Sequence, residues 1–125
     1  HAKDRRQRQM CIRDSHNSGH FTMDSCETSQ FQQHLLAVSG WPLGPTHIMK
    51  PVMLLNLIGD QQVKLLQNLK LLPEGAKLHL YGKKEVRPGR KMGHLNLSME
   101  NPSELLETLM KLQVWDQDSL ERMLN

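Results

Sequence analysis

Residues 77–98 read KLHLYGKKEVRPGRKMGHLNLS, and this stretch decides the fold. Apolar and polar side chains alternate over Lys77–Tyr81 and again over Met92–Ser98, which is the period of a half-buried strand. Between these runs, Pro88 followed by Gly89 is the preferred pair for the two central positions of a type II turn. The stretch therefore predicts two strands joined around a turn, a β-hairpin.

The predicted turn is strongly basic. Between residues 77 and 94, six Lys or Arg side chains stand against one acidic side chain. The basic residues are Lys77, Lys83, Lys84, Arg87, Arg90 and Lys91, and the acidic one is Glu85. Arginine offers a planar fork that matches a phosphate, and lysine a point charge. The pattern favours a site for one small anion, a phosphate or carboxylate; the alternative is a solvated loop whose charges serve solubility.

Two helices and one strand are predicted before the hairpin. Residues 16–24 are polar and contain glycine, which indicates a loop that leads into a strand or turn. Residues 27–39 carry apolar side chains at helical spacing and predict a helix, whereas the short apolar run 51–58 favours a buried strand. Residues 61–71 predict a short helix. The apolar positions of the first helix are Phe31, Leu35, Leu36 and Val38.

The clearest predicted helix follows the hairpin, at residues 101–113. Asn101 can cap it, Pro102 suits its first position, and Glu104 stands where a capping-box acid belongs. Residues 115–125 predict either a further short helix or a frayed tail. The predicted order is helix, strand, helix, strand, turn, strand, helix, which is an α+β fold with a small antiparallel sheet and flanking helices. Because the strands are few and short, we expect this body to pack against further structure.

Composition excludes several classes of protein. The chain has 125 residues, of which 38% are hydrophobic, which suits one core rather than a disordered chain. No apolar run approaches the roughly 20 residues of a membrane helix. The net charge of +3 resides in residues 1–15, so the body is neutral and nucleic-acid binding is not expected. Two cysteines make no disulfide framework, and a reducing cytoplasm is the expected compartment.

Histidines suggest ligand binding rather than metal chemistry. His16 and His20 flank Asn17-Ser18-Gly19, and the central glycine disfavours the helix on which such spacing would bind zinc. A loop with these polar side chains suits hydrogen bonds to a polar ligand; a capped turn is the alternative. No nucleophile with an adjacent base and no glycine-rich phosphate loop is present, so no catalytic residue and no metal ligand is assigned.

These pieces together resemble one family of ligases. The segments HNSGHFTMDSCETSQFQQHLLAVSGWPLG, PVMLLNLIG and LHLYGKKEVRPGRKMGHLNL are similar in order and spacing to the end of 5-(carboxyamino)imidazole ribonucleotide synthases. These are ATP-grasp ligases of purine biosynthesis, and the resemblance covers residues 16–112. It implies the C-terminal part of an ATP-grasp fold. It also implies an enzyme that uses ATP, with Mg²⁺, to carboxylate aminoimidazole ribonucleotide with bicarbonate, as a cytoplasmic homodimer when full length.

The resemblance also implies which residues bind substrate. Lys83 and Arg90 match basic residues that hold the ribose phosphate, in agreement with the charge pattern. His16 matches a residue near the imidazole and bicarbonate end of the site, with Asn17 beside it. The rest of the loop, Ser18 to His20, is expected to shape that end.

The departures from the family pattern concern the start of the chain. Family members carry an Asn-Glu pair that serves Mg-ATP, and then an Arg, before the segment that matches HNSGH, where this sequence has MCIRDS. We therefore expect residues 1–15 to be non-native or a disordered basic head, the natural protein to continue upstream, and this chain alone to be inactive. The expected division is 16–59 as the end of the ATP-grasp domain, 60–113 as the C-terminal domain, and 114–125 as a tail.

Two other functions remain open from the sequence. One is another ATP-grasp carboxylase or formyltransferase, which would share the architecture but not the RPGRKMGH turn. The other is a non-catalytic module that binds a phosphorylated ligand or a partner protein. Binding of aminoimidazole ribonucleotide would distinguish the synthase from both.

Overall fold

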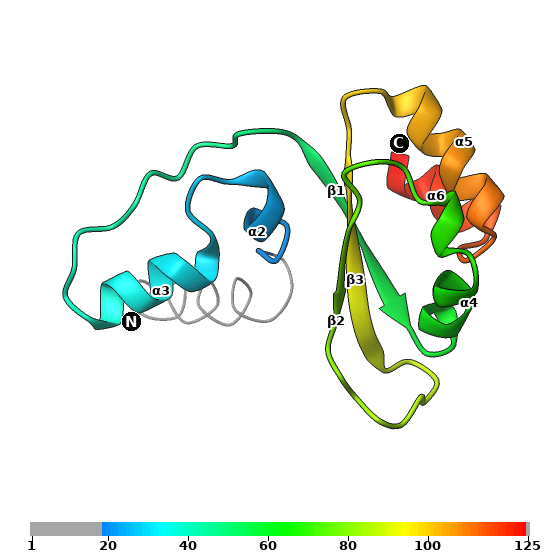
Figure 1. Ribbon diagram of the computed structural model, residues 1–125, viewed down its shortest axis with the longest axis horizontal. Coiled ribbons are helices and arrows are strands. Elements are labelled where there is room, and N and C mark those ends of the chain that lie inside the picture. The colour runs from blue at the N-terminus through cyan, green and yellow to red at the C-terminus, as the bar shows by residue number, and fades with distance from the viewer. Residues whose placement is uncertain (1–18, 125) are drawn as a thin grey trace. The chain divides into compact units, whose positions relative to one another are not determined.

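The computed structural model describes residues 19–124, so the predicted head and the predicted site residues His16 and Asn17 lie outside the described residues (Figure 1). The chain divides into two compact units, one that ends at Val52 and one that begins at Met53. The predicted division of a whole synthase at residue 59 stays a prediction. None of the helices in the described part has the length and apolar character that crossing a membrane requires.

The second unit is built on a three-stranded sheet. Its strands are β1 (Val52–Ile58), β2 (Lys77–Leu80) and β3 (Lys91–Ser98), in the order β1-β3-β2. The predicted hairpin is confirmed, because β2 and β3 pair antiparallel with Leu78 opposite Leu95. The backbone N–H of Gly59 donates to the Arg90 carbonyl at 2.8 Å, which brings the end of β1 to the start of β3.

Helices cover one side of this sheet (Figure 1). They are α4 (Gln61–Gln67), the 3-10 helix η2 (Leu69–Leu71), α5 (Pro102–Leu112) and α6 (Gln117–Leu124). Alternate residues of β1 and β3 belong to the core between the sheet and these helices, as a strand's two-residue period requires. The core residues are Leu55, Leu57, Leu65, Leu95, Leu97, Leu105, Leu109, Leu112, Val114, Trp115 and Leu120. Burial of such aliphatic side chains is the main stabilising term of the unit.

Polar caps delimit the last two helices. The Asn101 side chain accepts a hydrogen bond from the Glu104 N–H at 3.3 Å, as the sequence predicts, and Pro102 occupies the first turn. Gln113 adopts a left-handed conformation with φ of 53° and ends α5. The Asp116 carboxylate then accepts from the Ser119 N–H at 2.7 Å and starts α6. Of the two alternatives for the C-terminal segment, the structure has the helix.

The described part of the first unit contains the helices α2 (Thr22–Ser25) and α3 (Gln30–Val38). The predicted helix over 27–39 is confirmed but begins later, because Ser29 and Gln32 form a capping box that sets its start. The apolar stripe of α3 is exposed: Leu35 is 64% exposed and Val38 68%. Leu36 is half-buried, so the described residues cover this stripe only in part.

Two predicted segments differ from the structure. Residues 16–24 were expected to be a loop, but residues 22–25 form one helical turn. That turn is stabilised locally, since the Thr22 N–H and hydroxyl both donate to the Gly19 carbonyl. The helix predicted over 61–71 ends at Gln67 and continues as η2. The Asn68 side chain donates to the Lys64 carbonyl at 3.0 Å, and such side-chain bonds compete with helix continuation.

The close pairing of β2 and β3 gives a first prediction. A Cβ at Gly93 would lie inside contact distance of the His79 carbonyl oxygen, an atom of the paired strand's backbone. We therefore expect Gly93→Ala to lower the free energy of unfolding by about 1–3 kcal/mol, the usual cost of overpacking. Urea denaturation of the variant measures this. Ser103→Ala, at an exposed position of α5, is the control. An unchanged midpoint for Gly93→Ala would contradict the tight pairing.

The cap of α6 gives a second prediction, for acid. The Ser119 N–H bonded to Asp116 lowers the pKa of that carboxyl from its ordinary value. A carboxyl with a lowered pKa stabilises the fold above its unfolded-state pKa and loses that contribution as the pH falls through its folded-state pKa. We expect Asp116→Ala to destabilise the chain at pH 7, with the difference from wild type shrinking below about pH 4. Thermal unfolding across pH measures it, and Gln67→Ala, an uncharged change at an exposed position of α4, should show no such trend.

Candidate functional site

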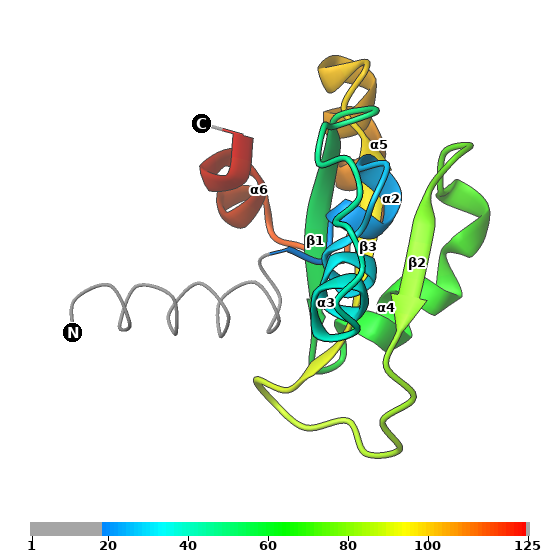
Figure 2. The same cartoon turned by 90° about the vertical axis from the view of Figure 1, so that its left-hand side faces the viewer.

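The loop at residues 81–90 joins β2 to β3 and extends beyond the helices at one end of the sheet (Figure 2). Residues 87–90 of the loop form the predicted turn, since the Arg90 N–H donates to the Arg87 carbonyl at 3.1 Å. Gly89, between them, has φ of 77°, as the third position of a type II turn requires. The turn chemistry predicted from Pro88-Gly89 is therefore present.

Lys83 and Arg90 tie the two arms of this loop together. The Lys83 ammonium donates to the Lys91 carbonyl at 2.6 Å, from the β2 arm to the β3 arm. The Arg90 guanidinium donates to the Glu85 carbonyl at 3.0 Å, in the opposite direction. Each bond uses a donor of a cationic head group, so both side chains have a defined position. An ammonium and a guanidinium each have more N–H donors than these bonds use, which leaves donors for an anion.

The other cations of the loop differ from these two. Arg87 pairs with Glu85, and its Nε donates to the carboxylate at 3.0 Å. This pair is about two-thirds exposed on both sides, so it contributes little stability. Glu85 therefore neutralises Arg87, which is not among the cations proposed for the anion. The Lys84 side chain is exposed. The backbone carbonyl of Lys91 accepts the hydrogen bond from Lys83.

Behind the loop lies an aromatic cluster that the sequence did not identify. The Tyr81 hydroxyl and the His94 Nδ1 are 2.8 Å apart, and the His79 and His94 rings stack with centroids 4.6 Å apart. The Lys83 ammonium lies 5.6 Å from the centroid of the Tyr81 ring. His94 is fully buried. The available signal was the two-residue spacing of His79, on β2, and Tyr81, which directly follows β2.

In the first unit, His20 of the HNSGH segment contacts the start of α3. Its Nδ1 is 3.0 Å from the Gln30 side-chain nitrogen, and its ring meets Phe31 edge to face at 5.2 Å. Thr22 adds a link, because its hydroxyl accepts from the Gln30 N–H at 2.9 Å. Residues 19–22 and the start of α3 therefore form one local structure.

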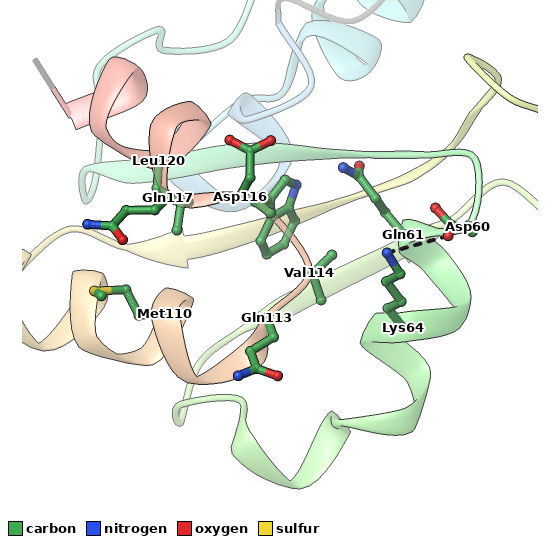
Figure 3. Close-up of a pocket in the computed structure, with 10 residues that line it drawn as sticks. Asp60, Gln61, Lys64, Met110, Gln113, Val114, Asp116, Gln117 and Leu120 are labelled. Carbon is green, nitrogen blue, oxygen red and sulfur yellow. Dashed lines mark ion pairs between the residues drawn. The ribbon is translucent and has the colours of Figure 1, made fainter.

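A separate hollow lies on the helical side of the second unit (Figure 3). It has a cavity volume of about 470 Å³, and its lining includes the ion pair of Asp60 and Lys64 at 3.4 Å. None of the predicted site residues lines it. Nor, in residues 19–124, do three or more His, Cys, Asp or Glu side chains gather where they could hold a metal ion.

Comparison with known families and proteins gives consistent matches. Residues 52–108 match the family model of the phosphoribosylaminoimidazole carboxylase C-terminal domain. The chain is 50% identical over 94 residues to the N5-carboxyaminoimidazole ribonucleotide synthase of Bacillus subtilis, covering 75% of this chain and 24% of that protein. It is 46% identical over 95 residues to the synthase of Synechococcus elongatus, again covering 24% of the relative. The chain thus spans about a quarter of the length of these curated relatives.

Solved structures agree with these matches. An ADP complex of N5-carboxyaminoimidazole ribonucleotide synthetase superposes with a TM-score of 0.74 at 46% identity, covering 81% of this chain and 26% of that one. The Aspergillus clavatus synthase, solved with ADP and 5-aminoimidazole ribonucleotide, gives a TM-score of 0.67 at 35% identity. That match covers 78% of this chain and 27% of that one. The α+β fold expected from the sequence is therefore confirmed as part of an ATP-grasp protein.

The turn geometry gives a third prediction. Because Gly89 has positive φ, Gly89→Val should strain the turn and break the bond from the Arg90 N–H to the Arg87 carbonyl. Gly89→Asn is the matched control, since asparagine tolerates the left-handed region. Amide hydrogen exchange at Arg90 should accelerate in the valine variant and change little in the asparagine variant. Equal exchange in both would show that the turn does not depend on this conformation.

Proposed function

Since the chain belongs to the N5-carboxyaminoimidazole ribonucleotide synthase family, we propose that its 81–90 loop binds the ribose phosphate of aminoimidazole ribonucleotide. The reaction of the whole enzyme is then the ATP-dependent carboxylation of that substrate to N5-carboxyaminoimidazole ribonucleotide, a ligase reaction of purine biosynthesis. The chain provides one wall of the substrate site.

One observation carries this proposal: the Lys83 ammonium and the Arg90 guanidinium each donate a hydrogen bond across the 81–90 loop. Fixed cations bind an anion without first losing side-chain freedom, which is a main cost of binding. Lysine and arginine head groups are also the usual partners of phosphate oxygens. Glu85 is the loop's acidic side chain, and it is engaged with Arg87 rather than with Lys83 or Arg90.

The Aspergillus clavatus relative supports the choice of substrate, since its structure was solved with 5-aminoimidazole ribonucleotide and ADP. Bicarbonate as the second substrate, Mg²⁺ beside ATP, a homodimer and a cytoplasmic compartment are further parts of the proposal that rest on resemblance alone. His16 and Asn17 are proposed to contact the imidazole and bicarbonate end of the substrate, on the same ground.

The family's ATP and Mg²⁺ are assigned to none of the described residues. Magnesium is held through carboxylates and substrate phosphates. In residues 19–124, no three or more His, Cys, Asp or Glu side chains gather where they could hold a metal ion. The role proposed for the described part is substrate binding, through Lys83 and Arg90.

The proposal predicts which cations the substrate needs. Arg90→Ala should weaken binding of aminoimidazole ribonucleotide by about 1.5–3 kcal/mol, the usual value of a hydrogen bond to a charged group. Isothermal titration of the 125-residue chain measures this. Lys83→Met should weaken binding as well, because it removes the second cation.

Lys84→Met is the matched control, since it removes an exposed lysine of the same loop and should leave affinity unchanged. Equal affinity of wild type, Lys83→Met and Arg90→Ala would show that the loop is a solvated turn and not the phosphate site. Uniform losses in all three variants would indicate general attraction to a positive surface, which also contradicts the proposal.

A further inference from the structure

We propose that Tyr81 is a positioning residue that fixes the Lys83 ammonium for its anion, and that His94 in turn holds Tyr81. This inference rests on the proposed function, because Lys83 is one of the two cations assigned to the substrate phosphate. Neither residue is assigned a contact with substrate; both act through Lys83.

The first step is the contact between Lys83 and Tyr81. The ammonium lies 5.6 Å from the ring centroid, within the range of a cation–π interaction. The same ammonium donates to the Lys91 carbonyl at 2.6 Å. A lysine side chain has several rotatable bonds, and one hydrogen bond leaves much of that freedom. The ring adds a second point of attachment, so the position of the ammonium is defined from two directions.

The second step is the attachment of Tyr81 itself. Its backbone N–H donates to the Met92 carbonyl at 3.1 Å, which ties it to β3. Its hydroxyl lies 2.8 Å from the His94 Nδ1. Burial raises the pKa of the Tyr81 hydroxyl above its ordinary value, so the hydroxyl keeps its proton at neutral pH and can donate a hydrogen bond. Both ends of the tyrosine are therefore held.

The third step is the rigidity of His94. It has no exposed surface, and it stands directly opposite His79 in the β2–β3 register. The two rings stack at an interplanar angle of 21°. The position of His94 is thus set by strand pairing. Strand register fixes His94, His94 fixes the Tyr81 hydroxyl, and the Tyr81 ring fixes Lys83.

The test reads the environment of Lys83 directly, with or without a ligand. In chains labelled with ¹³C at the lysine ε carbon, the Lys83 ε protons should resonate upfield of those of exposed Lys84, because the Tyr81 ring current shields them. Lys83→Met assigns the signal. Tyr81→Leu should remove the upfield shift and weaken binding of aminoimidazole ribonucleotide about fivefold, the value of a partly exposed cation–π contact. Tyr81→Phe keeps the ring, so this variant should retain most of the upfield shift and most of the affinity for aminoimidazole ribonucleotide.

The coupling to His94 is tested with a double-mutant cycle. His94→Phe keeps a stackable ring but removes the Nδ1 acceptor, so it should reduce the Lys83 shift as much as Tyr81→Phe does. The double variant should lose no more than either single variant. These conservative variants also decide the matter if Tyr81→Leu does not fold.

Two results would overturn the inference. One is a Lys83 shift that equals that of Lys84 in the wild type, and the other is additive losses in the double variant, which would remove His94 from the chain of contacts. A different result would overturn the proposed function: unchanged affinity in Lys83→Met, whatever the Lys83 shift. The two failures are therefore distinguishable.

Discussion

Antiparallel pairing of β2 with β3 is the constraint on which the site depends. The pairing sets the register that puts His79 opposite His94, and it brings the two arms of the 81–90 loop close enough for side chains to cross. Gly93 permits this approach, since any side chain there would meet the neighbouring backbone. The helical side of the sheet supplies the apolar burial that keeps β3 in place. A cationic loop between unpaired strands would have no such fixed geometry.

Much of this arrangement could be predicted from residues close together in the sequence. Period-two alternation predicted β2 and β3, Pro88-Gly89 predicted the turn, and Asn101 with Pro102 predicted the start of α5, because each signal acts within a few residues. Secondary-structure predictions differed from the structure where a local hydrogen bond from a polar side chain competed with the pattern of apolar and polar residues. The Thr22 hydroxyl stabilises a helical turn within a polar loop, and Asn68 ends α4 inside an apolar run.

The site was predicted less completely than the fold. Charge and turn chemistry identified Lys83 and Arg90, but a pattern of charges does not show which cation an acid will neutralise, and Glu85 selects Arg87. Tyr81 was missed because its role depends on a residue thirteen positions away across the hairpin. His16 and Asn17 stay predictions from resemblance. The loop differs from a simple cluster of charges because its cations are held in place. Two hydrogen bonds across the loop and one contact with an aromatic ring restrict the positions of these cations.

A crystal structure of the 125-residue chain with aminoimidazole ribonucleotide would test the central claim most directly. The account predicts that the ribose phosphate lies within hydrogen-bonding distance of both the Lys83 ammonium and the Arg90 guanidinium, with Lys83 still over the Tyr81 ring. A phosphate bound elsewhere on the chain, with these two head groups turned into solvent, would contradict it.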